Sequence, residues 1–192
     1  MTQLWWYLAR ASGLVAWLLL TASVLWGIFL STKLLQRLRR PAWLLDLHRW
    51  LGGLTVGFVT LHIGALVADS YVTFDLADVL LPFASRWRTG AVALGVVAMW
   101  ALAAVELTSL ALRRLPRATW KAVHLTSYLV FWATSLHAAL AGTDTANPLY
   151  VWTSVGSIVA VAFAVTYRVL TQRGPRNRQP SSAAPVHPLV RS

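Results

Sequence analysis

The chain has 192 residues, of which 57% are hydrophobic and only 12% are charged. Soluble domains carry about 25% charged residues, so this composition excludes an ordinary water-soluble enzyme and indicates a membrane protein. The sequence contains no cysteine, which excludes disulfides and thiolate-bound zinc or iron–sulfur sites. In a soluble protein the net charge of +11 would suggest nucleic-acid binding. In a membrane protein, basic residues more often mark the loops that face the cytoplasm, so their distribution has to be considered first.

Five segments are long and apolar enough to cross a bilayer of about 30 Å hydrocarbon thickness. In chain order they are 11–32, 51–68, 89–112, 122–143 and 145–167. We therefore predict an all-α membrane protein, a five-helix transmembrane bundle that occupies residues 1–170. Residues 171–192 are rich in Pro, Ser, Ala and Arg without periodicity, and we expect them to form a disordered cytoplasmic tail.

Lysine and arginine residues are distributed unevenly among the connections. Fourteen of the 17 fall after the first span, after the third span or in the tail, and only Arg10, Arg86 and Arg88 fall on the other side. The positive-inside rule then places the N-terminus outside and the C-terminus in the cytoplasm. Topology accounts for the charge, so we expect membrane lipid and no nucleic acid as a partner.

Four histidines lie on two of the predicted spans. His48 and His62 belong to the second span, and His124 and His137 to the fourth. The two spans are parallel because one span separates them, so His48 is level with His124 and His62 with His137. The rises within the spans are about 21 Å and about 19.5 Å. Haem iron binds histidine on both faces of the porphyrin, so two such pairs predict two stacked haems.

The spacing within the fourth span fits a straight helix poorly. At about 100° per residue, 14 residues fall only about 40° short of four full turns, whereas 13 residues fall about 140° short. His124 and His137 therefore do not point the same way on an ideal helix. We expect local tightening or a kink in this span, or haems approached from different angles.

A few polar residues near these histidines are further candidates. Arg49 follows a proposed ligand and is positioned to pair with a haem propionate. Glu106 is the one carboxylate well inside a span, where it either serves protons or the inner haem or snorkels toward the arginines that follow it. Asp69 and Asp144 follow the outer histidines and are candidates for holding a cation, although outer-loop acids are usually just solvated.

The paired histidines and their local sequences, such as Leu47-His48-Arg49 and Leu61-His62-Ile63, resemble the ferric reductase-like transmembrane domain over roughly residues 10–170. This superfamily includes ferric-chelate reductases, NADPH oxidases and the haem subunit of a bacterial methionine sulfoxide reductase system. The resemblance implies two b-type haems, His48 with His124 and His62 with His137. Complete enzymes of the family carry a sixth span and a flavin and nicotinamide module, and neither is found in this sequence.

The expected function is transmembrane electron transfer by the membrane haem subunit of an oxidoreductase, in a bacterial plasma membrane. A separate flavoprotein reductase or membrane quinol delivers electrons, and an outer-side acceptor receives them. Two alternatives stay open at this point. One is a single-haem or haem-sensing subunit in which the poorly phased pair is not ligated. The other is a haem-free transporter or assembly partner with structural histidines.

Overall fold

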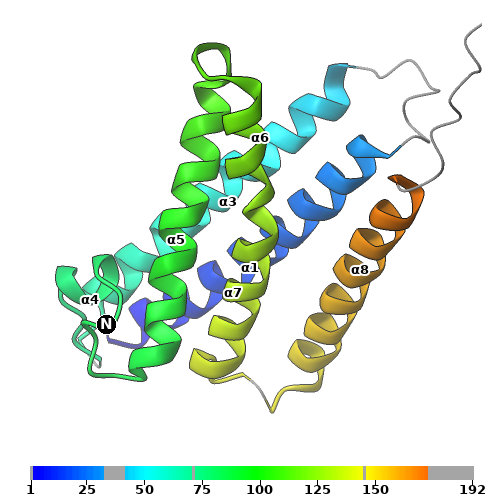
Figure 1. The fold of residues 1–192 in the computed structure, drawn as a ribbon. Helices are drawn as coiled ribbons and strands as arrows, with labels where there is room; N and C mark the ends of the chain where they lie inside the picture. The colour runs from blue at the N-terminus through cyan, green and yellow to red at the C-terminus, as the bar shows by residue number, and fades with distance from the viewer. Residues whose placement is uncertain (1, 33–41, 71, 145, 173–192) are drawn as a thin grey trace, which may run out of the picture.

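The computed structural model describes residues 2–32, 42–70, 72–144 and 146–172, and within these ranges the chain is helical and has no strand. Figure 1 shows the arrangement. The elements are α1 (Thr2–Ser31), α3 (Ala42–Ala68), α4 (Leu76–Leu80), α5 (Thr89–Leu110), the 3₁₀ turn η1 (Leu112–Arg114), α6 (Arg117–Leu125), α7 (Ser127–Ala141) and α8 (Pro148–Gln172). Residues 33–41, in the first basic connection, and residues 173–192, in the predicted tail, lie outside the described residues.

Four of the described helices, α1, α3, α5 and α8, are long and apolar enough to cross a membrane. The predicted fourth span is divided between α6 and α7, which meet at Thr126, and neither half is long enough to qualify alone. The all-α architecture is therefore confirmed, whereas the count of five spans stays a prediction. Both halves contact α5, so together they run beside it as one interrupted column.

Two helices begin earlier than the apolar runs indicate. α1 starts at Thr2 and α3 at Ala42, nine residues before the predicted second span. Asp46 and Arg49 interrupt the apolar run at the start of α3, but they form an i,i+3 ion pair of 3.2 Å that is compatible with a helix. The consequence is that His48 lies on the same continuous helix as His62.

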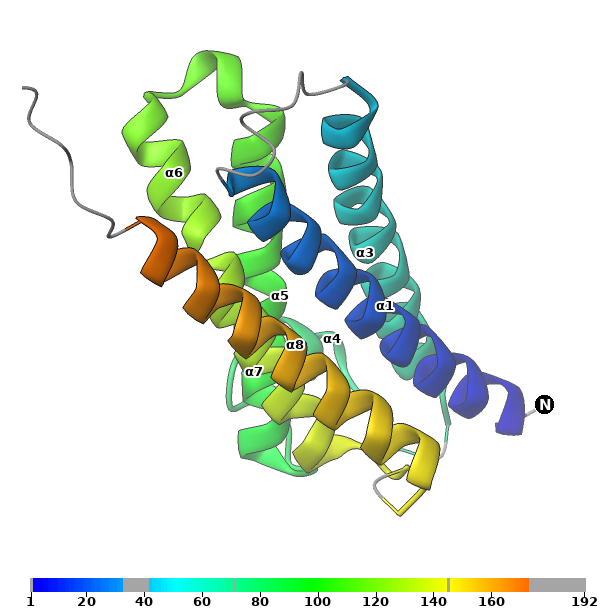
Figure 2. The same cartoon turned by 90° about the vertical axis from the view of Figure 1, so that its right-hand side faces the viewer.

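Helix α1 is the centre of the bundle. It contacts α3 along its length and also touches α7 and α8, while α5 packs against α6 and α7. Figure 2 shows α8 alongside α1 at the edge of the bundle. Indole N–H groups fasten α1 to its neighbours: Trp26 donates to the Leu44 carbonyl at 2.8 Å, and Trp17 to the Ser135 hydroxyl at 3.0 Å.

A tightly packed apolar cluster joins four helices in the middle of the bundle. Its buried members are Leu20, Val24, Ile28, Ala98, Leu102, Val130, Phe131 and Val161. Helices in lipid gain little from hydrophobicity itself, because lipid tails are as apolar as leucine, so close packing at such clusters holds them together.

Replacing Phe131 by alanine removes a side chain that is fully buried. Truncating a buried phenylalanine leaves a cavity, so we expect Phe131→Ala to lower the free energy of unfolding by about 3 kcal/mol. Phe163→Ala on α8 is the matched control, since that ring is 72% exposed on the bundle, and its expected change is within about 0.5 kcal/mol. Unfolding by SDS in mild detergent, followed by tryptophan fluorescence, measures both. Equal losses in the two variants would contradict this assignment of the core.

Candidate functional site

The inner pair of histidines is formed across α3 and α6. The rings of His48 and His124 have centroids 5.9 Å apart and planes at 80°. An imidazole nitrogen lies about 2 Å from a bound metal, so two rings on opposite sides of one metal ion have centroids roughly 6 Å apart. The pair therefore has the separation that two axial ligands of one iron require.

The outer pair is formed across α3 and α7. His62 and His137 both line a cavity of about 230 Å³ between α1, α3, α5 and α7. The cavity wall is predominantly apolar. An apolar cavity of about 150 Å³ already admits a benzene-sized ligand, so this one has room for an organic group beside the two rings.

Backbone carbonyls fix the outer histidines. Nδ1 of His62 lies 2.7 Å from the Ala9 oxygen on α1, and Nδ1 of His137 lies 2.7 Å from the Ala91 oxygen on α5. A carbonyl only accepts, so in each bond Nδ1 carries the proton and donates it. The lone pair is then on Nε2 of both rings. This arrangement, with one nitrogen held by an acceptor and the other presented as a ligand, is the one found at metal-binding histidines.

The inner histidines are held less uniformly. Nδ1 of His48 is 3.3 Å from the hydroxyl oxygen of Ser23. Nδ1 of His124 is buried and has no hydrogen-bond partner among the described residues. That ring is instead stacked on Trp120, with centroids 5.0 Å apart and planes at 22°. Stacking fixes the plane of the His124 ring but leaves its tautomer undetermined.

The break at Thr126 lies between the two histidines of the predicted fourth span. Its backbone N–H donates to the Val123 carbonyl at 3.0 Å, an i→i−3 bond of the 3₁₀ type. A 3₁₀ turn rotates the chain more per residue than an α-helix does, because it has three residues per turn and not 3.6. The angle between the directions of His124 and His137 is therefore smaller than on a straight α-helix. Tightening or a kink was one of the predicted solutions, and the observed break is of this kind.

The donor set suits haem better than a bare metal ion. Within the described part of the chain, no group of three or more His, Asp or Glu side chains could hold a metal. Haem iron takes only its two axial ligands from the protein, because the porphyrin supplies the other four. His62 and His137, each with Nδ1 held by a carbonyl and Nε2 free beside an apolar cavity, fit that requirement.

The remaining predicted candidates lie as follows. The Arg49 side chain is 67% exposed and pairs with Asp46, so the structure does not bring it to the histidine rings. The carboxylate of Glu106 lies against Gly52 of α3, and no described ion pair joins it to an arginine. Asp69 is buried rather than solvated. Asp144 is occupied by an ion pair with Arg10, which does not suit it to hold a cation.

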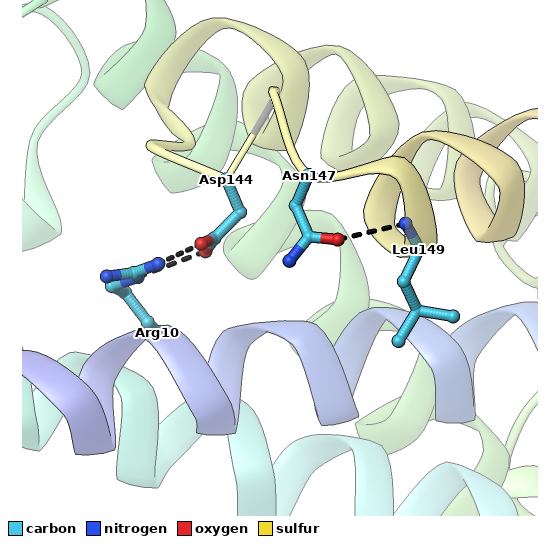
Figure 3. A network of polar contacts seen from close by, with 4 residues as sticks. All are labelled: Arg10, Asp144, Asn147 and Leu149. Carbon is cyan, nitrogen blue, oxygen red and sulfur yellow. Dashed lines mark hydrogen bonds and ion pairs between the residues drawn. The ribbon is translucent and has the colours of Figure 1, made fainter.

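This ion pair stands at the edge of the outer cavity, which both residues line. Figure 3 shows the Arg10 guanidinium of α1 facing both oxygens of Asp144, which follows α7. In the same loop the backbone N–H of Leu149 donates to the side-chain oxygen of Asn147 at 2.9 Å. This bond satisfies one of the N–H groups at the start of α8 that have no partner within the helix. The loop after α7 is thereby fastened to α1 above the outer pair.

Sequence reasoning missed the oxygens that hold the rings. Nothing in the local sequence marks the Ala9 and Ala91 carbonyls, since every residue has one. The hydroxyl of Ser23 is equally inconspicuous, because serines elsewhere on α1 bond only to their own helix. A signal is nevertheless present in the glycines that accompany these residues, as argued below.

A family model described as "Ferric reductase like transmembrane component" matches residues 12–135, about two thirds of the chain. The chain belongs to this family. The match contains His48, His62 and His124 and ends two residues before His137. Searches of curated proteins and of solved structures give no match. Membership confirms the predicted resemblance and indicates an integral membrane protein that transfers electrons across the membrane. Domains of this family generally bind haem.

The ion pair at the cavity edge can be tested by charge exchange. Arg10 and Asp144 are 33% and 25% exposed, so solvent screens the pair and its contribution is about 1 kcal/mol at most. We expect Asp144→Arg to lower thermal stability in detergent, and the double exchange Arg10→Asp with Asp144→Arg to recover most of the loss. A double variant no more stable than the single one would show that the two side chains do not interact.

Proposed function

We propose that this chain is the membrane haem subunit of an oxidoreductase and carries electrons through two b-type haems. His48 and His124 hold the inner haem, and His62 and His137 hold the outer one. The observation that carries the proposal is the placement of the four described histidines at two levels, with the His48 and His124 ring centroids 5.9 Å apart and with His62 and His137 lining one apolar cavity. The sets lie 14 residues apart along α3, a rise of about 21 Å.

A bound haem supplies the one-electron Fe(III)/Fe(II) couple. The chain supplies the axial nitrogens, their orientation and the surroundings. Two histidine ligands for each haem would leave no coordination position for oxygen, which would favour electron transfer over oxygen binding. The apolar wall of the outer cavity keeps water from the rings, and the Arg10–Asp144 pair fastens the loop over it. We also propose that Arg49 pairs with a propionate of the inner haem. To do so, its guanidinium would leave the exposed ion pair with Asp46.

The distribution of charge sets the orientation of the bundle, whereas the direction of electron flow is taken from the family resemblance. Among the described residues, Arg113, Arg114 and Arg117 lie between α5 and the start of the helix that carries His124, so the end of the bundle where His48 and His124 meet faces the cytoplasm under the positive-inside rule. A flavoprotein reductase or a membrane quinol would deliver electrons on the side of His48 and His124, and an acceptor outside a bacterial plasma membrane would receive them on the side of His62 and His137.

Single-histidine variants test the ligand assignment. We expect His62→Ala and His137→Ala each to lose one haem of two while the inner haem is retained, and His48→Ala and His124→Ala to lose the inner haem. His187→Ala, in the tail, is the matched control and keeps both. Haem per chain is measured by pyridine haemochrome, and the remaining centre by reduced-minus-oxidised spectra. If the wild type binds one haem per chain and His137→Ala still binds one, the single-haem alternative is supported.

The natural absence of cysteine makes the orientation directly testable. Single cysteines are introduced at two exposed positions, Ala146→Cys after α7 and Ala118→Cys in α6. We expect a membrane-impermeant maleimide to label the first in intact cells and the second only in inverted vesicles. The reverse pattern would place the C-terminus outside and reverse the proposed direction of electron flow.

A further inference from the structure

Three of the four histidine rings lie directly against a glycine of a neighbouring helix. A Cβ added to Gly13 on α1 would lie 2.9 Å from Nδ1 of His62, and one added to Gly95 on α5 would lie 2.8 Å from Nδ1 of His137. A Cβ on Gly27 of α1 would lie 3.2 Å from Cε1 of His48. Real Cβ atoms essentially never approach within 3.0 Å, so the first two positions exclude any side chain while the rings stay in place.

Each glycine comes four residues after the group that bonds the same ring. Ala9 precedes Gly13, and its carbonyl accepts from His62. Ala91 precedes Gly95, and its carbonyl accepts from His137. The spacing repeats at the inner level, where the Ser23 hydroxyl contacts His48 and Gly27 follows four residues later.

Helix geometry explains the spacing of four. A side chain on an α-helix leans toward the N-terminus and covers the surface over the preceding turn. A Cβ at position i+4 therefore covers the oxygen of residue i, which already accepts one N–H within the helix. A glycine at i+4 leaves the second lone pair of that carbonyl open to a ring from another helix.

From these contacts we infer that Gly13 and Gly95 are positioning residues, which open a carbonyl on the preceding turn so that it fixes the facing histidine with Nε2 presented to iron, and that Gly27 positions the His48 ring beside the Ser23 hydroxyl. The inference rests on the proposed function for its reference to iron. The placement of the rings and their bonds to Ala9, Ala91 and Ser23 do not depend on it.

Among the described residues, His124 is the histidine that lacks both a facing glycine and an oxygen partner. No described glycine lies against His124, and its Nδ1 is the buried side-chain atom left without a partner in the described chain. Its ring is positioned by Trp120 instead. Rings that face a glycine are thus held by an oxygen, and the ring that does not is held by stacking.

The other described glycines provide matched controls. An alanine Cβ at Gly90, also on α5, or at Gly156 on α8 meets nothing within 4 Å. Both positions are exposed, so Gly90→Ala and Gly156→Ala add the same methyl group without approaching a ring. These variants separate the effect of displacing a histidine from the general effect of alanine in a helix, which is to stabilise it modestly.

The first measurement is retention of haem by the purified full-length variants. We expect Gly13→Ala and Gly95→Ala to weaken retention of the outer haem by about 10- to 100-fold, the range found when an outer-shell partner is lost, while the inner haem stays. Gly27→Ala acts on the inner haem, and less strongly, because its contact is longer. The potential of any outer haem still bound also shifts, since the hydrogen bond to its ligand is altered. The two control variants keep both haems at unchanged potentials.

The second measurement needs no haem. ¹⁵N NMR of histidine-labelled protein prepared without haem reports which ring nitrogen carries the proton. We expect the Nδ1–H form for His62 and His137 in the wild type and in Gly156→Ala, and its loss for His62 in Gly13→Ala and for His137 in Gly95→Ala. Unchanged tautomers and haem retention in those two variants would overturn the inference. A wild type that binds no haem, yet shows these tautomer changes, would overturn the proposed function and leave the positioning role standing.

Discussion

The interaction on which this structure depends is the hydrogen bond from each outer histidine to a backbone carbonyl, which satisfies one ring nitrogen and leaves the other free. A polar group in hydrocarbon without a partner is costly, and a ring with both nitrogens engaged by protein cannot bind a metal. The bonds from His62 to Ala9 and from His137 to Ala91 meet both demands at once. They also place α1 and α5 against the histidine-bearing helices, so the arrangement of the bundle and the state of the rings are determined together.

The two levels of the bundle are built differently. At the outer level both rings donate to helix carbonyls and face an apolar cavity fastened by the Arg10–Asp144 pair. At the inner level one ring contacts a hydroxyl and the other is stacked on Trp120. A ring that donates to a carbonyl is a more basic ligand. Under the proposed function, the two sites would therefore offer iron ligands of different strength, which would separate the properties of two haems of one chemical type.

Much of this organisation could be predicted from the sequence, for identifiable reasons. Long uncharged runs indicated membrane helices, and the spacing of His48 with His62 placed both on one helix at two depths. The 13 residues between His124 and His137 predicted an irregularity that the break at Thr126 now supplies. The carbonyl partners could not be predicted, because contact between helices decides which backbone oxygens are exposed. Hydropathy also did not predict the division of the fourth span into α6 and α7, because a single turn of altered backbone does not change the apolar character of the sequence.

The central claim is tested most directly by counting low-spin haem in the wild-type protein purified from a haem-replete host. Two six-coordinate b-type haems per chain, titrating as two one-electron steps and unreactive toward carbon monoxide, are the result that four histidine ligands in two facing pairs predict. A colourless protein, or a single haem with an open coordination position, would contradict the assignment of both pairs as axial ligands.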